Sequence, residues 1–250
     1  MNDGLRINAN PAPADAVLPG PGAGLLGVVM LDTQFPRPVG DIGNADTFAV
    51  PVKHRVVRGA WPDKVVASAT GLRAGRVVPA FVAVMRQLER EGATAITTSC
   101  GFLVLLQKEL QAAVRVPVVT SSLLQLPGLL AKEPQVGVLT ISASRLSAEH
   151  LRAAGVKRER LRDVVVQGVD PAGEFATAIL GNRGSMDLDK ARDDVVAAAV
   201  VLKARAPGLH HVVLECTNMP PYADAVRAAT GFTLHSLRDS PRLARFFATA

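Results

Sequence analysis

Short runs of Val, Ile and Leu alternate with longer segments of helical periodicity along most of this chain. Residues 78–91 and 188–205 carry apolar side chains at helical spacing. Apolar runs of strand length lie at 25–31, 94–98, 116–120, 136–141, 164–166, 211–215 and 232–235. This alternation is typical of βαβ units, in which helices cover both faces of a parallel sheet. The sequence therefore predicts an α/β fold with mostly parallel sheets.

The composition excludes several classes of protein. Hydrophobic residues make up 48% of the chain and charged residues 20%, as in a globular protein. The longest apolar run, 195–202, is much shorter than the roughly 20 residues of a membrane span. The net charge is +6, but basic residues are interspersed with acidic ones, which disfavours a nucleic-acid interface. We therefore expect neither a membrane nor a nucleic-acid partner.

Cysteine usage and the start of the chain bear on its location. The chain has two cysteines and no secretory signal, which indicates free thiols and a cytoplasmic location. Residues 1–23 are rich in Pro, Ala, Gly and Asn and lack an apolar signal core. We expect them to form a disordered N-terminal arm.

Sequence landmarks recur in the same order in the two halves of the chain. Gly27 opens GVVMLDT and Gly137 opens GVLTISA, and Cys100 and Cys216 follow at nearly equal separations. Each cysteine comes after a helix and a strand and before another helix. The repetition predicts two similar lobes related by a pseudo-twofold axis: a first lobe of 24–122 plus 225–250 and a second of 123–224.

Both cysteines stand where ligands bind in parallel α/β sheets, beyond the carboxyl ends of strands. Two similar lobes would bring Cys100 and Cys216 to opposite sides of one cleft. Unpaired amide groups at the start of the following helix are expected to lower the pKa of each thiol. A thiolate base and a thiol acid on opposite faces of a carbon acid can invert its stereocentre without a cofactor.

The runs that carry these residues resemble a known family. GVVMLDTQFPRPVGDIGN, TTSCGF, VPVVTSS, GVLTISA and LECTNMPPYA are similar to the cofactor-independent aspartate/glutamate racemase superfamily, from about Gly24 onward. That superfamily includes hydantoin racemases, arylmalonate decarboxylases and maleate isomerases. The resemblance implies catalytic Cys100 and Cys216 between two α/β lobes, assisted by Asp32, with no pyridoxal phosphate, metal or nucleotide. We accordingly expect an isomerase, a racemase or epimerase of a small carboxylate such as an amino acid.

The residues after each thiol depart from the amino-acid racemases of this group. Those enzymes usually carry Cys-Asn-Thr at the first thiol, where this chain has Gly101 and Phe102 after Cys100. At the second thiol they often carry Cys-Thr-His or Cys-Thr-Glu, where this chain has Cys-Thr-Asn. The usual partners of an amino-acid substrate are therefore partly missing, and Phe102 favours a bulkier one. The candidate substrate-binding residues are Gly101, Phe102, Ser121, Ser122, Thr217 and Asn218.

Each of these residues also has a structural interpretation. Asp32 can form a turn, Ser121, Ser122, Thr217 and Asn218 can cap helices, and free cysteines are common core residues. His210 and His211 lack the further ligands of a metal site, so we expect none. The glycines of GAGLLG precede a strand, which excludes a dinucleotide fingerprint. The long polar segment 33–64 is expected to be a loop that covers the cleft, with His54, Arg55 and Arg58 at the surface.

Two other functions remain open. The same fold could decarboxylate a small diacid or isomerise it between cis and trans, with one thiol dominant. A non-catalytic small-molecule binding protein with inert thiols is the alternative from another class. A homo-oligomer is compatible with the sequence.

Overall fold

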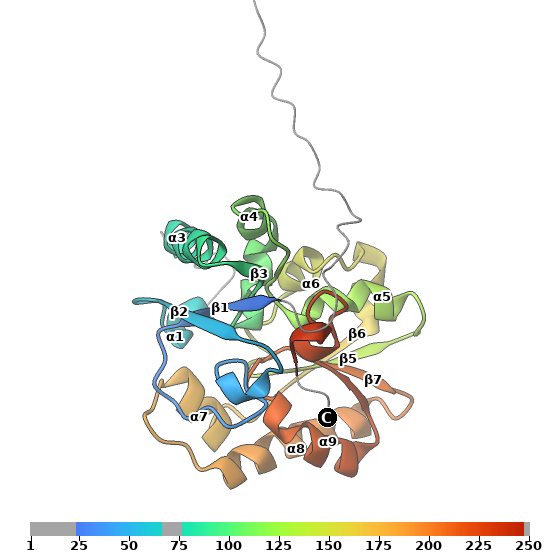
Figure 1. Ribbon diagram of the computed structural model, residues 1–250. Helices are drawn as coiled ribbons and strands as arrows, with labels where there is room; N and C mark the ends of the chain where they lie inside the picture. Colours follow the sequence, from blue (N-terminus) through green and yellow to red (C-terminus); the bar gives the residue numbers. More distant parts are fainter. Residues whose placement is uncertain (1–23, 67–76, 248–250) are drawn as a thin grey trace, which may run out of the picture.

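The computed structural model describes residues 24–66 and 77–247 (Figure 1). These residues form two four-stranded parallel sheets, with the orders β2-β1-β3-β4 and β6-β5-β7-β8. The second order repeats the first with each strand number raised by four, so the predicted pair of similar α/β lobes is confirmed. The strands are β1 (Leu25–Leu31), β2 (Val52–Val57), β3 (Ala93–Thr98), β4 (Val118–Val119), β5 (Val136–Thr140), β6 (Val164–Gly168), β7 (His211–Leu214) and β8 (Thr233–His235).

Helices connect the strands and cover the sheets. In Figure 1, α3 and α4 lie at one end of the molecule, beside the first sheet, while α8 and α9 lie at the other. The α-helices are α1 (Pro62–Val65), α3 (Val77–Arg90), α4 (Gln107–Ala112), α5 (Leu126–Leu130), α6 (Ala148–Ala153), α7 (Glu174–Leu180), α8 (Leu188–Arg205) and α9 (Ala223–Thr230). Short 3-10 segments are η1 (Ala45–Thr47), η2 (Gly101–Leu106), η3 (Ser122–Gln125), η4 (Arg158–Asp163), η5 (Pro220–Tyr222), η6 (Leu237–Asp239) and η7 (Ala244–Phe246).

Burial explains why the central strands were readable from the sequence. β1 and β5 are flanked by strands on both edges and covered on both faces, so nearly every side chain in them is buried. A strand in this position reads as a continuous apolar run. The helix expected at 188–205 is α8, whose first turn is capped by the Asp187 carboxylate accepting from the Lys190 amide.

The segment 33–64 is not a loop throughout, and this part of the prediction is wrong. It contains the edge strand β2, whose run VKHRVV is only half buried because one edge has no neighbouring strand. Lys53 and Arg55 on this strand form ion pairs with Glu91, with N–O distances of 3.3 and 2.8 Å. Polar side chains are common on such edge strands. They removed the apolar pattern that would have revealed β2.

The predicted return of the chain to the first lobe at residue 225 is also wrong for residues 225–235. β8 pairs in parallel with β7, which places α9 and β8 in the second lobe. The chain crosses back only after His235. There Leu237, Leu243 and Phe246 pack in one apolar cluster with side chains of β1.

Two further predictions concern the N-terminal arm and the membrane. The N-terminal arm expected at residues 1–23 lies outside the described residues. Across the parts of the chain that the structure describes, no helix has the length and apolar character to cross a membrane.

Candidate active site

The two thiols line one small cavity between the lobes. Cys100 follows β3 and Cys216 follows β7, and each of these strands lies beside the first strand of its lobe at the point where strand order reverses. Open parallel sheets bind ligands at such switch points. The cavity has a volume of about 20 Å³, which is room for about one water molecule.

Apolar side chains form most of the cavity wall. They come from both lobes and are Leu31, Phe35, Pro62, Val66, Phe102, Ile141, Ile179 and Leu180. The remaining lining residues are Thr33, Ser99, Cys100, Gly101, Glu215, Cys216 and Asn218. The cavity is therefore narrow and largely apolar, with the polar groups gathered around the two sulfur atoms.

Amide groups reach each sulfur as the sequence suggested, yet burial has the larger effect. The backbone amides of Phe102 and Leu103 act to lower the pKa of Cys100, and the amide of Asn218 acts to lower that of Cys216. Desolvation by burial, followed by the charge of Glu215, nevertheless raises the pKa of Cys100 to about 12. The same two causes raise the pKa of Cys216 well above its ordinary value. The prediction of lowered thiol pKa values is therefore wrong.

Glu215, directly before the second cysteine, is a site residue that the sequence analysis missed. Its side chain lines the thiol cavity and is 1% exposed. Thr140 donates a hydrogen bond of 2.7 Å to its Oε2, while its Oε1 is buried without a hydrogen-bond partner among the described residues. Burial raises the pKa of Glu215 to about 8. The available signal was a carboxylate ending the apolar run VVLE, where a buried charge is costly.

The glycine after the first thiol makes room for this acid. A Cβ added to Gly101 would lie 2.3 Å from both the backbone oxygen and Oε1 of Glu215. Any side chain at position 101 would therefore collide with the acid in its present place. Gly101, where the racemases usually carry Asn, and Glu215 thus belong to one arrangement in which the two lobes meet closely.

A polar chain leads from the second thiol to a buried acid in the segment 33–64. The Cys216 thiol donates to Asn218 Oδ1 at 3.4 Å, and Asn218 Nδ2 donates to Asp41 Oδ2 at 2.6 Å. The other carboxylate oxygen of Asp41 pairs with Arg37 at 2.7 Å. Asn218 therefore lies in the wall of the same cavity as the two cysteines. Asp41 was missed because it lies in a polar segment without a distinctive pattern.

Asp32 lies apart from this arrangement. Its carboxylate accepts a hydrogen bond of 2.9 Å from the Gly59 amide, and its backbone oxygen accepts one from Asn182. It is not among the described residues that line the thiol cavity. The acid that the structure brings beside both thiols is Glu215.

The predicted hydroxyl groups join the lobes. Ser122 donates to the backbone oxygen of Leu214 at 2.6 Å, and Thr217 donates to that of Ser99 at 2.9 Å. Ser121 caps η3 by accepting from the Leu123 amide. Both serines lie outside the described wall of the thiol cavity.

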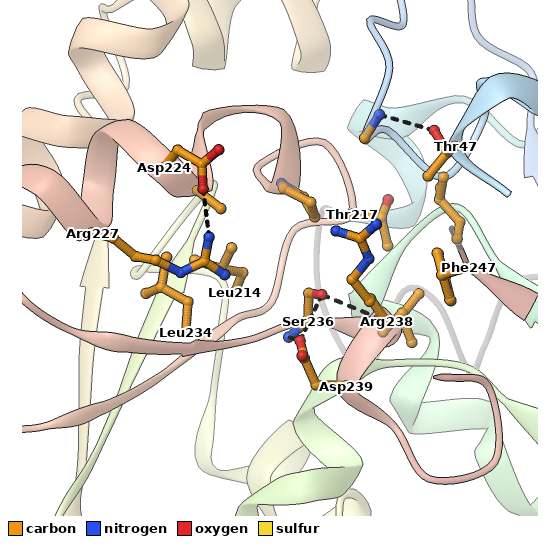
Figure 2. A pocket seen from close by; sticks show the side chains of 15 residues that line it. Thr47, Leu214, Thr217, Asp224, Arg227, Leu234, Ser236, Arg238, Asp239 and Phe247 are labelled. Carbon is orange, nitrogen blue, oxygen red and sulfur yellow. Dashed lines mark hydrogen bonds and ion pairs between the residues drawn. The ribbon is translucent and has the colours of Figure 1, made fainter. Parts of the chain in front are cut away.

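Thr217 instead faces a second cavity, shown in Figure 2. That cavity has a volume of about 290 Å³ and lies between the segment around Ile42, α9 and the C-terminal turns. Arg227 and Arg238 are among the residues that line this cavity. Arg227 forms an ion pair with Asp224, with an N–O distance of 2.7 Å. The described residues that line this cavity include neither cysteine nor Glu215.

The remaining candidates are an aromatic residue and a histidine. Phe102 lines the thiol cavity and packs edge-on against His150, with ring centroids 5.0 Å apart. His211 contacts His235 at 2.9 Å and Glu133 at 3.4 Å on the second lobe. In the described ranges, no group of three or more His, Cys, Asp or Glu side chains is arranged to hold a metal ion.

Comparison with known proteins identifies the family. A family model described as Asp/Glu/hydantoin racemase matches residues 57–236. The chain belongs to this family. The family resemblance predicted from the strand and cysteine motifs is thus confirmed.

Two relatives with about 30% sequence identity are lyases. The dimethylsulfoniopropionate lyase of Durusdinium sp. clade D is 31% identical over 217 residues, covering 84% of this chain and 70% of the relative. Dimethylsulfoniopropionate lyase 3 of Emiliania huxleyi is 30% identical over 238 residues, covering 87% of this chain. The match covers 61% of that relative, which is less than two thirds of its length.

Solved structures share the fold at low sequence identity. A variant of arylmalonate decarboxylase has a TM-score of 0.52 at 16% identity, covering 84% of this chain and 86% of its own. A glutamate racemase from Bacillus anthracis has a TM-score of 0.51 at 15% identity, covering 88% of this chain and 79% of its own. The family is one of enzymes: its model is described by racemases, and the relatives at about 30% identity are named as lyases. The isomerase class predicted from the sequence is therefore not established by the family.

Proposed function

We propose that this protein is a cofactor-independent lyase that removes the α-proton of a small carboxylate and expels a group from the β-carbon. Dimethylsulfoniopropionate is the substrate to test first, because relatives named for it are about 30% identical over more than four fifths of this chain. The observation that carries the proposal is the pair of thiols in one narrow cavity at the strand ends of both lobes. Such a cavity offers a general base and excludes water from a carbanion-like transition state.

The reaction balances without a cofactor. A thiolate takes the proton from the carbon next to the carboxylate, and the C–H electron pair becomes the new C=C bond. The bond from the β-carbon to sulfur breaks, and its electron pair leaves with dimethyl sulfide. The products are dimethyl sulfide, acrylate and the protonated thiol, which then releases its proton to solvent.

The contacts of the two sulfur atoms favour Cys100 as the base. The backbone amides of both Phe102 and Leu103 act to lower the pKa of its thiol, which favours the thiolate. The Cys216 thiol instead donates its proton to Asn218 Oδ1. In this assignment Cys216 stays protonated and polarises the substrate from the opposite lobe.

Substrate entry requires the cavity to widen, because its present volume of about 20 Å³ is too small for a molecule of this size. The walls that must separate are apolar contacts between the lobes. Pro62 and Val66, on and just after α1, lie on one side, and Ile179 and Leu180 of α7 on the other. Closure around the substrate would restore the dry surroundings of the reacting atoms.

The decisive experiment incubates the purified protein with dimethylsulfoniopropionate and measures dimethyl sulfide in the headspace and acrylate by proton NMR. We expect both products in equal amounts, and their loss in Cys100→Ala. Glu109→Gln, a change at an exposed carboxylate outside the wall of the thiol cavity, serves as the matched control. Absence of product from the wild-type protein, or full activity of Cys100→Ala, would contradict the proposal.

Racemisation is the second candidate, and the specific observation in its favour is that both lobes contribute a thiol to the cavity. A two-base racemase exchanges the α-hydrogen of both substrate enantiomers with deuterium from solvent. Proton NMR in deuterium oxide with amino acids and hydantoins tests this. Exchange in both enantiomers, lost in either Cys→Ala variant, together with no cleavage of the sulfonium compound, would favour racemisation over elimination.

A further inference from the structure

The proposed reaction uses the sulfur atoms of the thiol cavity and assigns no role to Glu215, an acid in its wall. Glu215 is 1% exposed, and its Oε1 is buried without a partner among the described residues. Its Oε2 accepts a hydrogen bond from the Thr140 side chain. Leaving a buried carboxyl oxygen unpaired is unfavourable, so an acid kept in this state is expected to meet a ligand.

The rest of the cavity wall defines the charge that such a ligand carries. Among the described residues that line the cavity there is no Lys, Arg or His, and Glu215 is the only acid. The rings of Phe35 and Phe102 form part of the same wall. Aromatic faces attract methylated cations, and a buried carboxylate adds direct charge complementarity. A dicarboxylate such as glutamate would find no cationic side chain in this described wall.

We propose that Glu215 is the binding site for a methylated onium group, sulfonium or quaternary ammonium, which the carboxylate pairs with while Phe35 and Phe102 enclose the methyl groups. The inference rests on the proposed function in that the onium group is the one borne by the β-carbon of the substrate. It adds the substrate class: a zwitterion with an onium group on one side and a carboxylate on the other. Glu215 therefore selects cationic substrates over dicarboxylates of similar size.

The same contact links substrate charge to the state of the thiols. The charge of Glu215 is the second cause that holds the pKa of both cysteines high, after burial. Where Glu215 is ionised, an onium group beside it offsets that charge and so removes this second cause. A substrate with an onium group thus promotes formation of the thiolate base, whereas a molecule of the same shape without the positive charge does not.

The absence of a side chain at Gly101 leaves room for the Glu215 carboxyl group. Because a Cβ at that position would meet Glu215 Oε1 at 2.3 Å, only glycine leaves the acid where it faces the cavity. The pair of Gly101 and Glu215 thereby distinguishes this site from one that holds an amino group by an Asn side chain after the first thiol.

The test compares two ligands of the same shape and different charge. 3-(Trimethylammonio)propanoate carries the onium group, and 4,4-dimethylpentanoate replaces the nitrogen by carbon. Isothermal titration calorimetry measures both affinities for the wild-type protein, Glu215→Gln and the control Glu109→Gln. We expect the onium ligand to bind the wild type and the control about tenfold or more tightly than the carbon isostere. In Glu215→Gln the two affinities should become nearly equal.

A second measurement uses the wild-type protein alone and remains valid if the variant fails to fold. Burial raises the pKa of Glu215 to about 8, so the acid is mostly protonated near pH 7. Binding of the onium ligand should ionise it and release close to one proton, seen as a dependence of the measured heat on the ionisation enthalpy of the buffer. The carbon isostere, which lacks the positive charge, should release none.

The inference is overturned if the wild type binds the onium ligand no better than the isostere, if it binds neither ligand at millimolar concentration, or if Glu215→Gln keeps the full preference. Its failure is separable from that of the proposed function. Dimethyl sulfide production that is unchanged in Glu215→Gln would support the lyase and refute the onium site. Onium preference without dimethyl sulfide production would support the site and refute the lyase.

Discussion

Replacing Glu215 by Gln should make the stability of this protein less dependent on pH. In the folded protein the acid is buried and its pKa is raised to about 8 from an ordinary value of 4.5. In the unfolded chain the same group is solvated and ionises near its ordinary value. Between these two pH values the unfolded state loses a proton that the folded state keeps, so the wild type becomes less stable as pH rises.

The size of the effect follows from the two pKa values. The stability contributed by protonated Glu215 is fully present below 4.5 and is lost as pH rises to about 8. At about 1.4 kcal/mol per pH unit, the complete loss is about 5 kcal/mol above both values. About 1 kcal/mol of it has occurred at about pH 5 and about 4 kcal/mol at about pH 8. The wild type should therefore lose about 3 kcal/mol across this interval because of Glu215 alone.

Urea unfolding followed by circular dichroism, at a series of pH values from about 5 to 8, measures the difference between wild type and Glu215→Gln. Other titrating groups, such as His54 and His235, are common to both proteins and cancel in this difference. The Gln side chain retains an acceptor for Thr140, so any packing cost is a constant offset. Glu109→Gln, which changes an exposed acid, should show a difference that hardly varies with pH.

A difference between wild type and Glu215→Gln that stays constant across this interval would refute the reasoning. It would mean that Glu215 ionises in the folded protein near its ordinary pKa, and that desolvation does not govern the cavity. A wild type that gains stability relative to Glu215→Gln as pH rises would show the wrong sign and would refute it equally.

Three further outcomes are expected at the same site. Burial raises the pKa of Cys100 to about 12, so iodoacetamide should label it about a thousandfold more slowly near neutral pH than an ordinary thiol of pKa 9.0. Labelling should become rapid once urea unfolds the protein. Fast labelling of the native protein would contradict this. Gly101→Ala should displace Glu215 and lower the urea midpoint, since the added Cβ would lie 2.3 Å from the acid, whereas an unchanged midpoint would show that the lobes are not in close contact there. Asn218→Ala should cost about 1–3 kcal/mol by leaving the buried Asp41 Oδ2 without its 2.6 Å donor, and Asp41→Asn in the same background should recover part of this loss in a double-mutant cycle.

Local pattern was sufficient wherever burial on both faces left a continuous apolar run. The central strands β1, β3, β5 and β7 were predicted within a few residues, and α8 at its observed bounds. β2 was missed because an edge strand keeps polar side chains on its exposed side. The change of lobe near residue 225 was misplaced because strand pairing, here of β8 with β7, depends on distant residues.

Part of the candidate active site could likewise be predicted from the sequence, and part could not. The sequence determined that two thiols stand at equivalent strand ends, because the spacing of strand, cysteine and helix repeats along the chain. Only the tertiary structure decided which groups surround those thiols. It placed Glu215 in the cavity, linked Asp41 to Cys216 through Asn218, and left Asp32 on a neighbouring turn. The physical reason is desolvation: the charge state of a thiol or a carboxyl depends on how much water the folded lobes remove from it, and no local run of residues records that amount.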